Sequence, residues 1–124
     1  MRFLFLKAYW SLVSFDRSVA RNRFADLHAR VRRCRIRAKA PPADVVERIS
    51  SAVNLACIWY WKEVLCLQRS AATTCLLKQH GVAAQMVIGT QRMPFKAHAW
   101  VEVDGAVVND KPYTPEMYQV LDRC

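Results

Sequence analysis

The chain has 124 residues, of which 53% are hydrophobic, and a formal net charge of +9. This length suits one domain, and the apolar content is sufficient for a core, which excludes an intrinsically disordered chain. The longest uncharged run, residues 49–61, is too short to span a bilayer, which takes about 20 residues. The first residues do not form a signal peptide, because Lys7 interrupts the apolar run and no small-residue cleavage site follows.

The charge is concentrated at the N-terminus. Residues 1–40 contain eleven Lys and Arg against Asp16 and Asp26, while the other 84 residues contain eight basic and eight acidic residues and sum to zero. We therefore expect a single domain, 1–124, made of a basic helical layer, 1–40, and a catalytic core, 41–124. The layer can contact an anionic membrane surface or an acidic peptide, or it can be a solvated helix face, and we expect no nucleic-acid partner.

The cysteines indicate the compartment. There are five, an odd number, without a C-x-x-C pair or a Cys/His cluster. This pattern argues against a disulfide framework and against a zinc site, and it favours a reducing, cytoplasmic environment. We expect Cys34, Cys57 and Cys75 to be small buried hydrophobic residues and Cys124 to be a thiol at the chain end.

Helical patterns fill the first half of the chain. Apolar residues at helical spacing predict two N-terminal helices, and we expect their apolar stripes to pack against the rest of the domain. The stripes are formed by Phe3, Leu6, Tyr9, Trp10 and Val13, then by Phe24, Leu27 and Val31. A third helix is predicted to start near Pro41 and Pro42 and to bury Val46, Ile49, Val53 and Ala56. The aromatic residues of the following IWYW run, 58–61, are expected to supply core or pocket wall.

The second half changes to a strand pattern after one more helix. We expect a helix from about Cys66 to His80, because Gly81 supplies a C-terminal stop. A buried strand at 82–89, a loop containing Pro94 and a hairpin with an Asp104-Gly105 turn should follow, then a short helix starting near Thr114. The predicted fold class is α+β, with the helices first and an antiparallel sheet of at least three strands.

Cys66, His98 and Asp110 form the candidate catalytic set. A thiol at a helix start is near free backbone N–H groups, which favour the thiolate, and a carboxylate beside an imidazole orients it as a base. The hairpin register decides whether His98 and Asp110 meet. A two-residue loop places them on opposite faces, whereas a three-residue loop, 103–105, pairs His98 with Asp110, and we predict the second register.

Two blocks of the sequence resemble the lasso-peptide leader peptidases, which are transglutaminase-like cysteine proteases. They are Cys66-Leu67-Gln68-Arg69-Ser70 and Pro94-Phe95-Lys96-Ala97-His98-Ala99-Trp100. The resemblance covers roughly residues 40–124 and implies a transglutaminase-like or papain-like core with Cys66 as nucleophile, His98 as base and Asp110 as orienting carboxylate. Tyr60, where proline is common, and the polar segment 72–75 depart from the pattern. Arg69, Ser70, Trp61 and Trp100 are candidates for substrate binding or structural support.

The resemblance also implies a function and partners. The family removes the leader from a precursor peptide, often with a separate leader-recognition protein, before an ATP-dependent cyclase closes a macrolactam ring. With 124 residues we expect a stand-alone peptidase without a fused recognition module. No metal or organic cofactor is expected, because a thiol, a base and backbone donors complete the chemistry. Two alternatives remain: a transglutaminase-like acyltransferase, and a non-catalytic basic adaptor that uses residues 1–40.

Overall fold

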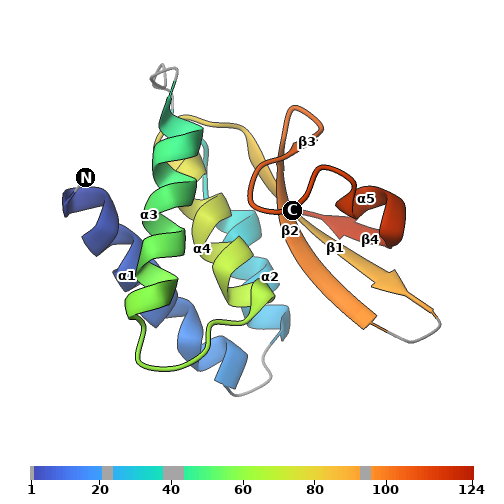
Figure 1. Cartoon of the computed structure of the whole chain (residues 1–124), viewed down its shortest axis with the longest axis horizontal. Helices are drawn as coiled ribbons and strands as arrows, with labels where there is room; N and C mark the ends of the chain where they lie inside the picture. Colours follow the sequence, from blue (N-terminus) through green and yellow to red (C-terminus); the bar gives the residue numbers. More distant parts are fainter. Residues whose placement is uncertain (1, 21–23, 38–43, 93–95) are drawn as a thin grey trace.

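Four helices form one half of the molecule and a small sheet forms the other (Figure 1). The computed structural model describes residues 2–20, 24–37, 44–92 and 96–124. The helical elements are α1 (Arg2–Ala20), α2 (Phe24–Arg33), α3 (Val45–Trp59), α4 (Cys66–Gln79) and α5 (Thr114–Met117). The strands are β1 (Ala84–Gln91), β2 (Lys96–Val103), β3 (Ala106–Val107) and β4 (Gln119–Arg123).

The central element is α4, which packs against α1, α2 and α3 on its sides and against β1 and β2 of the sheet. Its residues from Ser70 to Lys78 are buried. Small side chains such as Ala71 and Ala72 allow neighbouring helices to approach closely, which suits a helix enclosed on several sides. The predicted helix from about Cys66 to His80 is confirmed.

The third helix packs as its sequence pattern predicts. Ile49, Val53 and Ala56 are buried, and Val46 packs against the core at its edge. The expected start at Pro41 and Pro42 lies outside the described residues. Of the aromatic residues in the IWYW run only Tyr60 is buried, so the prediction that they supply core or pocket wall is wrong for Trp59 and Trp61.

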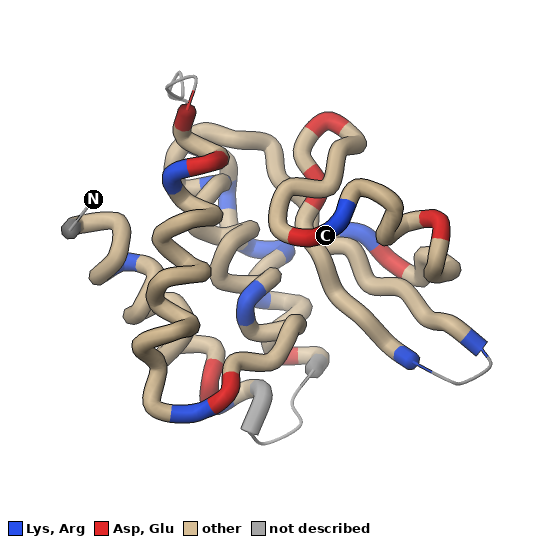
Figure 2. Tube along the Cα trace, viewed as in Figure 1, with Lys and Arg blue, Asp and Glu red and all other residues tan. Residues whose placement is uncertain are grey.

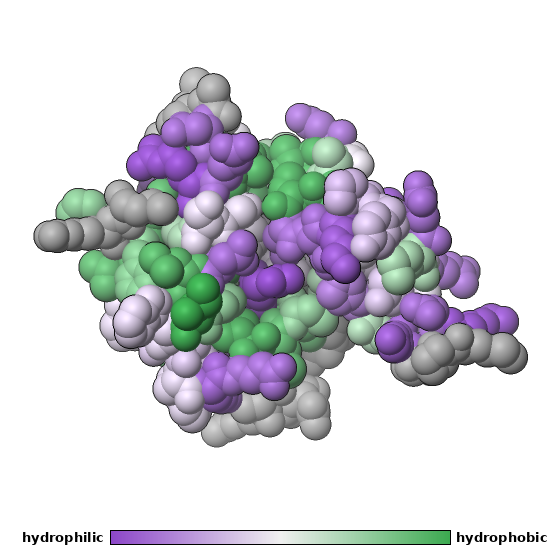
Figure 3. Space-filling view, viewed as in Figure 1, coloured by the Kyte–Doolittle hydropathy of each residue, from purple (hydrophilic) through white to green (hydrophobic). Residues whose placement is uncertain are grey.

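The first helix exists as predicted but packs through a different face. Ala8, Leu12 and Phe15 are buried, whereas the side chains of Phe3 and Trp10 are 81% and 69% exposed. Residues 2–20 carry apolar side chains on two faces of the helix. The spacing therefore identified an apolar stripe but did not show which of the two faces is buried. Figure 3 shows the hydrophobic surface that α1 and α3 leave on the left of the view.

Basic residues are not restricted to one end of the molecule. Figure 2 shows Lys and Arg both on the helices and where β1 ends and β2 begins. In the part of the chain that the structure describes, no helix is long and apolar enough to cross a membrane.

The sheet has four antiparallel strands in the order β3-β2-β1-β4. The long β1–β2 ladder pairs Met86 with Val101 and Ile88 with Ala99. β4 was not predicted, because its five residues alternate between exposed and half-buried positions and give only a weak apolar pattern. The prediction of an antiparallel sheet with at least three strands is confirmed.

The cysteine prediction is wrong for one pair. Cys34, just after α2, forms a disulfide with Cys75 in α4, with a Cα to Cα distance of 5.8 Å. These residues are 41 apart in sequence, and spacing alone does not report that α2 packs beside α4. Cys57, Cys66 and Cys124 are free.

Candidate active site

The hairpin that carries the candidate histidine turns through two residues. Val103 pairs with Ala106, so the loop is Asp104-Gly105, and the predicted three-residue loop is wrong. Both loop residues have positive φ, 51° for Asp104 and 79° for Gly105. This is the conformation that Asp-Gly adopts readily and that matches the twist of the flanking strands.

His98 and Asp110 nevertheless meet, because β3 ends before the register can separate them. Its last pair is Val107 with Glu102, and the chain bends at Val108 to Asp110. The Val108 N–H still donates to the Val101 carbonyl at 3.0 Å. The Val101 N–H donates instead to the side-chain oxygen of Asn109, at 2.8 Å. A side chain therefore takes the place of the next backbone acceptor, and Asp110 is free to turn towards β2.

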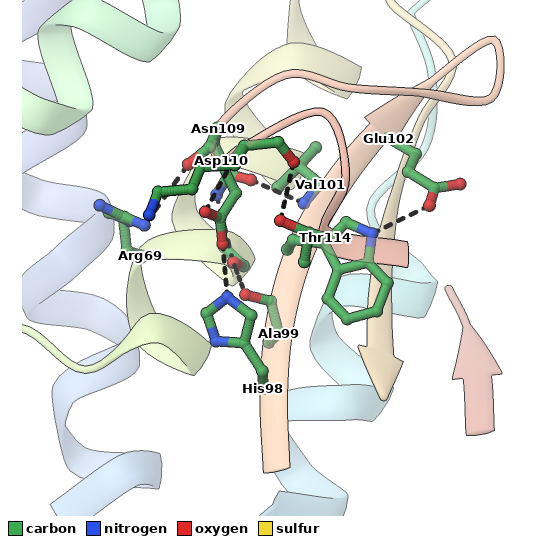
Figure 4. A network of polar contacts seen from close by, with 11 residues as sticks. Arg69, His98, Ala99, Val101, Glu102, Asn109, Asp110 and Thr114 are labelled. Carbon is green, nitrogen blue, oxygen red and sulfur yellow. Dashed lines mark hydrogen bonds and ion pairs between the residues drawn. The ribbon is translucent and has the colours of Figure 1, made fainter. Parts of the chain in front are cut away.

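The imidazole of His98 donates from Nε2 to Oδ2 of Asp110 (Figure 4). A carboxylate can only accept, so Nε2 carries the proton, and in the neutral ring Nδ1 presents a lone pair. Burial by itself would raise the pKa of the Asp110 carboxyl. The hydrogen bonds from His98 and from the Lys111 N–H, together with the charge of Arg69, outweigh burial and leave the pKa below its usual value.

The thiol of Cys66 lies at the first residue of α4 and is partly buried. The N–H of such a residue has no acceptor within the helix, because the first N–H groups of a helix are not used by the i to i−4 pattern. Cys66 and His98 line the same cavity of about 160 Å³, with Leu67, Ile88, Ala97 and Ala99 forming the rest of its wall. The structure thus places the thiol and the imidazole at one opening between α4 and β2.

A polar network connects α4 to the segment that carries Asp110 (Figure 4). The Ser70 hydroxyl donates to the Ala99 carbonyl at 3.1 Å and accepts from the Asn109 amide at 3.2 Å. The Arg69 guanidinium donates to the Asn109 carbonyl at 3.4 Å. Ser70 and Arg69 therefore hold the helix, β2 and the Asp110 segment together, and neither is among the described residues that line the cavity.

The two candidate tryptophans have different surroundings. Trp100 is fully buried behind His98, with the ring centroids 6.0 Å apart, and its indole N–H donates to Glu102 at 2.9 Å. Trp61 is 71% exposed, stacks on Tyr60 and lies under the Lys62 ammonium. Trp100 thus supports the imidazole, while Trp61 lies outside the cavity.

Three residues that position the histidine were not identified from the sequence. Tyr118 packs against both His98 and Trp100, at 5.4 and 5.9 Å between ring centroids. Gly89 gives those rings space, because a Cβ there would lie 2.8 Å from Trp100. Of the three, Asn109 was the most predictable from the sequence, because it directly precedes the candidate acid and a polar amide placed there needs a hydrogen-bond partner.

The described residues contain no group of His, Cys, Asp or Glu side chains that could hold a metal ion. The groups that the structure brings together at the candidate site are a thiol, an imidazole, a carboxylate and the hydrogen-bonded segment behind them.

Comparison with known proteins agrees with this fold. Over 56 residues the chain is 39% identical to the microcin J25-processing protein McjB of Escherichia coli, a match that covers 45% of this chain and 27% of that protein. No solved structure matches the chain. The sequence matches the transglutaminase-like superfamily over residues 9–123, nearly its whole length, and the chain belongs to this superfamily.

Proposed function

We propose that this protein is a cysteine peptidase that removes the leader from a ribosomally made lasso-peptide precursor. In this proposal Cys66 is the nucleophile, His98 is the general base and acid, and Asp110 orients the imidazole. The observation that carries it is the position of His98, which bonds Asp110 through Nε2 and lines one cavity with the Cys66 thiol.

The reaction has two half-reactions. His98 Nδ1 takes the proton of the Cys66 thiol, and the thiolate attacks the scissile carbonyl carbon. The tetrahedral intermediate collapses as the C–N bond breaks, and the imidazolium protonates the departing amine. Water, deprotonated by Nδ1, then hydrolyses the thioester and regenerates the thiol. The N–H of Cys66, free at the helix start, is the first donor proposed for the oxyanion.

The substrate and partners follow from the resemblance and from the relative's name, which describes processing of microcin J25. We propose a precursor peptide as substrate, a leader-recognition protein that presents it, and an ATP-dependent macrolactam cyclase that acts next. We also propose a cytoplasmic location, where ATP is available to the cyclase. The Cys34–Cys75 disulfide removes the argument for this location based on unpaired cysteines.

The test is mass spectrometry of a leader-bearing precursor incubated with the recognition protein and this chain. Wild type, Cys66→Ala and Cys57→Ala are compared, because Cys57 is a free, partly buried cysteine that does not line the cavity. Loss of the leader with wild type and Cys57→Ala, but not with Cys66→Ala, is expected.

Two outcomes would contradict the proposal. Cleavage that survives Cys66→Ala would place the nucleophile elsewhere. A product whose mass shows transfer of the acyl group to an amine instead of water would establish the acyltransferase alternative with the same three residues.

A further inference from the structure

The cavity beside the thiol has an almost entirely carbon wall. Apart from Cys66 and His98, it is lined by Leu67, Ile88, Ala97 and Ala99. Its volume of about 160 Å³ is close to the roughly 150 Å³ of an apolar protein cavity that can hold a benzene molecule. The cavity is thus large enough for a branched aliphatic side chain and offers no charged partner from these wall residues.

The sheet explains why this apolar wall is partly open to solvent, with Ala97 exposed, Ile88 half-buried and Ala99 buried. Met86 and Val101 pair with each other and are buried in the core. The next pair on the same face is Ile88 with Ala99, followed by Thr90 with Ala97. Figure 1 shows the end of β1 and the start of β2 extending past the helices. The apolar face therefore continues beyond the first turn of α4 to the exposed Ala97, where no helix of the described residues covers it and a ligand can bind.

The backbone beside this wall is available to an extended peptide. The N–H and C=O of Val101 point away from β1, since they bond Asn109 and Val108. Backbone groups alternate along a strand, so those of Ala99 and Ala97 point to the same side. The Ala99 carbonyl is taken by Ser70, and among the described residues no strand pairs with β2 beside Ala97. The Ala97 carbonyl and N–H can therefore bond a peptide backbone placed along this edge.

We propose that this cavity binds an aliphatic side chain of the substrate, within two residues of the cleaved bond on its acyl side. Ile88, Ala97 and Ala99 would set the size and chemistry that are accepted. The acyl side is favoured because this part of the substrate becomes bonded to Cys66, and Cys66 and Leu67 form one wall of the cavity. The inference rests on the proposed peptidase function and adds the class of substrate residue.

The test uses two series of peptidyl chloromethyl ketones, acetyl-Ala-Xaa and acetyl-Xaa-Ala, with Xaa as Gly, Val, Leu, Phe, Lys or Glu. The Cys66 thiolate displaces chloride from the probe, and peptide mapping reports labelling at Cys66 separately from Cys57 and Cys124. In one of the two series Val or Leu should label Cys66 at least about tenfold faster than Gly, Lys or Glu, the discrimination typical of an apolar pocket.

Two wall variants and one matched control sharpen the test. Ile88→Ala enlarges the cavity and should raise the rate with Phe relative to Val. Ala97→Leu fills the cavity and should lower the rate with Leu relative to Gly by about tenfold or more. Ile58→Ala removes the same atoms as Ile88→Ala from a side chain that is 76% exposed and outside the cavity, and should leave every ratio unchanged.

The outcomes separate this inference from the proposed function. Three outcomes would overturn the cavity assignment alone, provided that Cys66-dependent cleavage persists. They are equal labelling rates for all side chains in both series, faster labelling with Lys or Glu, and wall variants whose rate ratios do not change. Iodoacetamide, which has no side chain to place, reports the thiol itself. If the folded protein shows no labelling of Cys66 by any reagent and no cleavage, both the proposed function and this inference fail.

Discussion

Replacing Asn109 with alanine tests whether a side-chain hydrogen bond, and not the strand register, brings Asp110 to His98. The variant loses the bond from the Val101 N–H at 2.8 Å and the bond to Ser70 at 3.2 Å. Each is worth about 1 kcal/mol net, and the Val101 N–H is left without its acceptor in a fully buried residue. We expect the free energy of unfolding to fall by about 2–3 kcal/mol, which a typical domain with about 5–15 kcal/mol survives.

The expected effect on catalysis is larger than the effect on stability. If the Asp110 carboxylate moves by about 1 Å, the imidazole loses its orientation, and such misplacement can cost about 10²-fold in rate. We therefore expect kcat for leader cleavage to fall by about 10- to 100-fold with little change in KM, since Asn109 does not line the cavity. Initial rates are measured by mass spectrometry, and unfolding by urea titration.

Two comparisons decide the interpretation. Asn54→Ala, an exposed asparagine on α3, is the matched control and should behave as wild type. Asn109→Ala combined with Asp110→Ala should be no slower than Asp110→Ala alone, because Asn109 acts through Asp110. A folded Asn109→Ala variant with wild-type kcat, or rate losses that multiply in the double variant, would refute the reasoning.

Three further predictions concern stability. Because the folded-state pKa of Asp110 is lowered, the contribution of its charge to stability is fully present above the ordinary value of 3.8 and is lost as the pH falls through the lower folded value. The stabilities of wild type and Asp110→Asn in urea titrations should therefore converge as the pH is lowered below 3.8. The Cys34–Cys75 disulfide closes a loop of 41 residues, so reduction or Cys34→Ser should cost up to about 4 kcal/mol, and thiol counting before reduction should find three free cysteines. Gly89→Ala would force a Cβ to within 2.8 Å of Trp100, and thermal unfolding should show a loss of about 1–3 kcal/mol; an unchanged midpoint would contradict the packing.

The local elements of the fold were predictable because local patterns encode them. The period of apolar residues defined α3, and the stop at Gly81 defined the end of α4. The start of α4 at Cys66 and the strand position of His98 followed from the same local signals. These predictions succeeded because helix ends and strand alternation depend on residues within a few positions of each other.

The arrangement of the site depended on contacts that local patterns do not carry. The prediction that His98 and Asp110 meet is confirmed, but the strand register from which it was derived is not the one in the structure. The Asp-Gly sequence favours a two-residue turn. The Asp110 carboxylate reaches His98 because β3 ends early and the Asn109 side chain takes the place of a backbone acceptor on β3. Which atoms replace a missing ladder partner depends on the surrounding tertiary structure.

By itself, the sequence determined the order of the elements other than β4, and the thiol, imidazole and carboxylate that they carry. Only the tertiary structure decided which face of α1 is buried, that Cys34 meets Cys75, and that Ile88, Ala97 and Ala99 line a cavity beside the thiol. The reason is physical: element formation is governed by short-range backbone and side-chain preferences, whereas burial, disulfide pairing and cavities depend on which distant surfaces pack together.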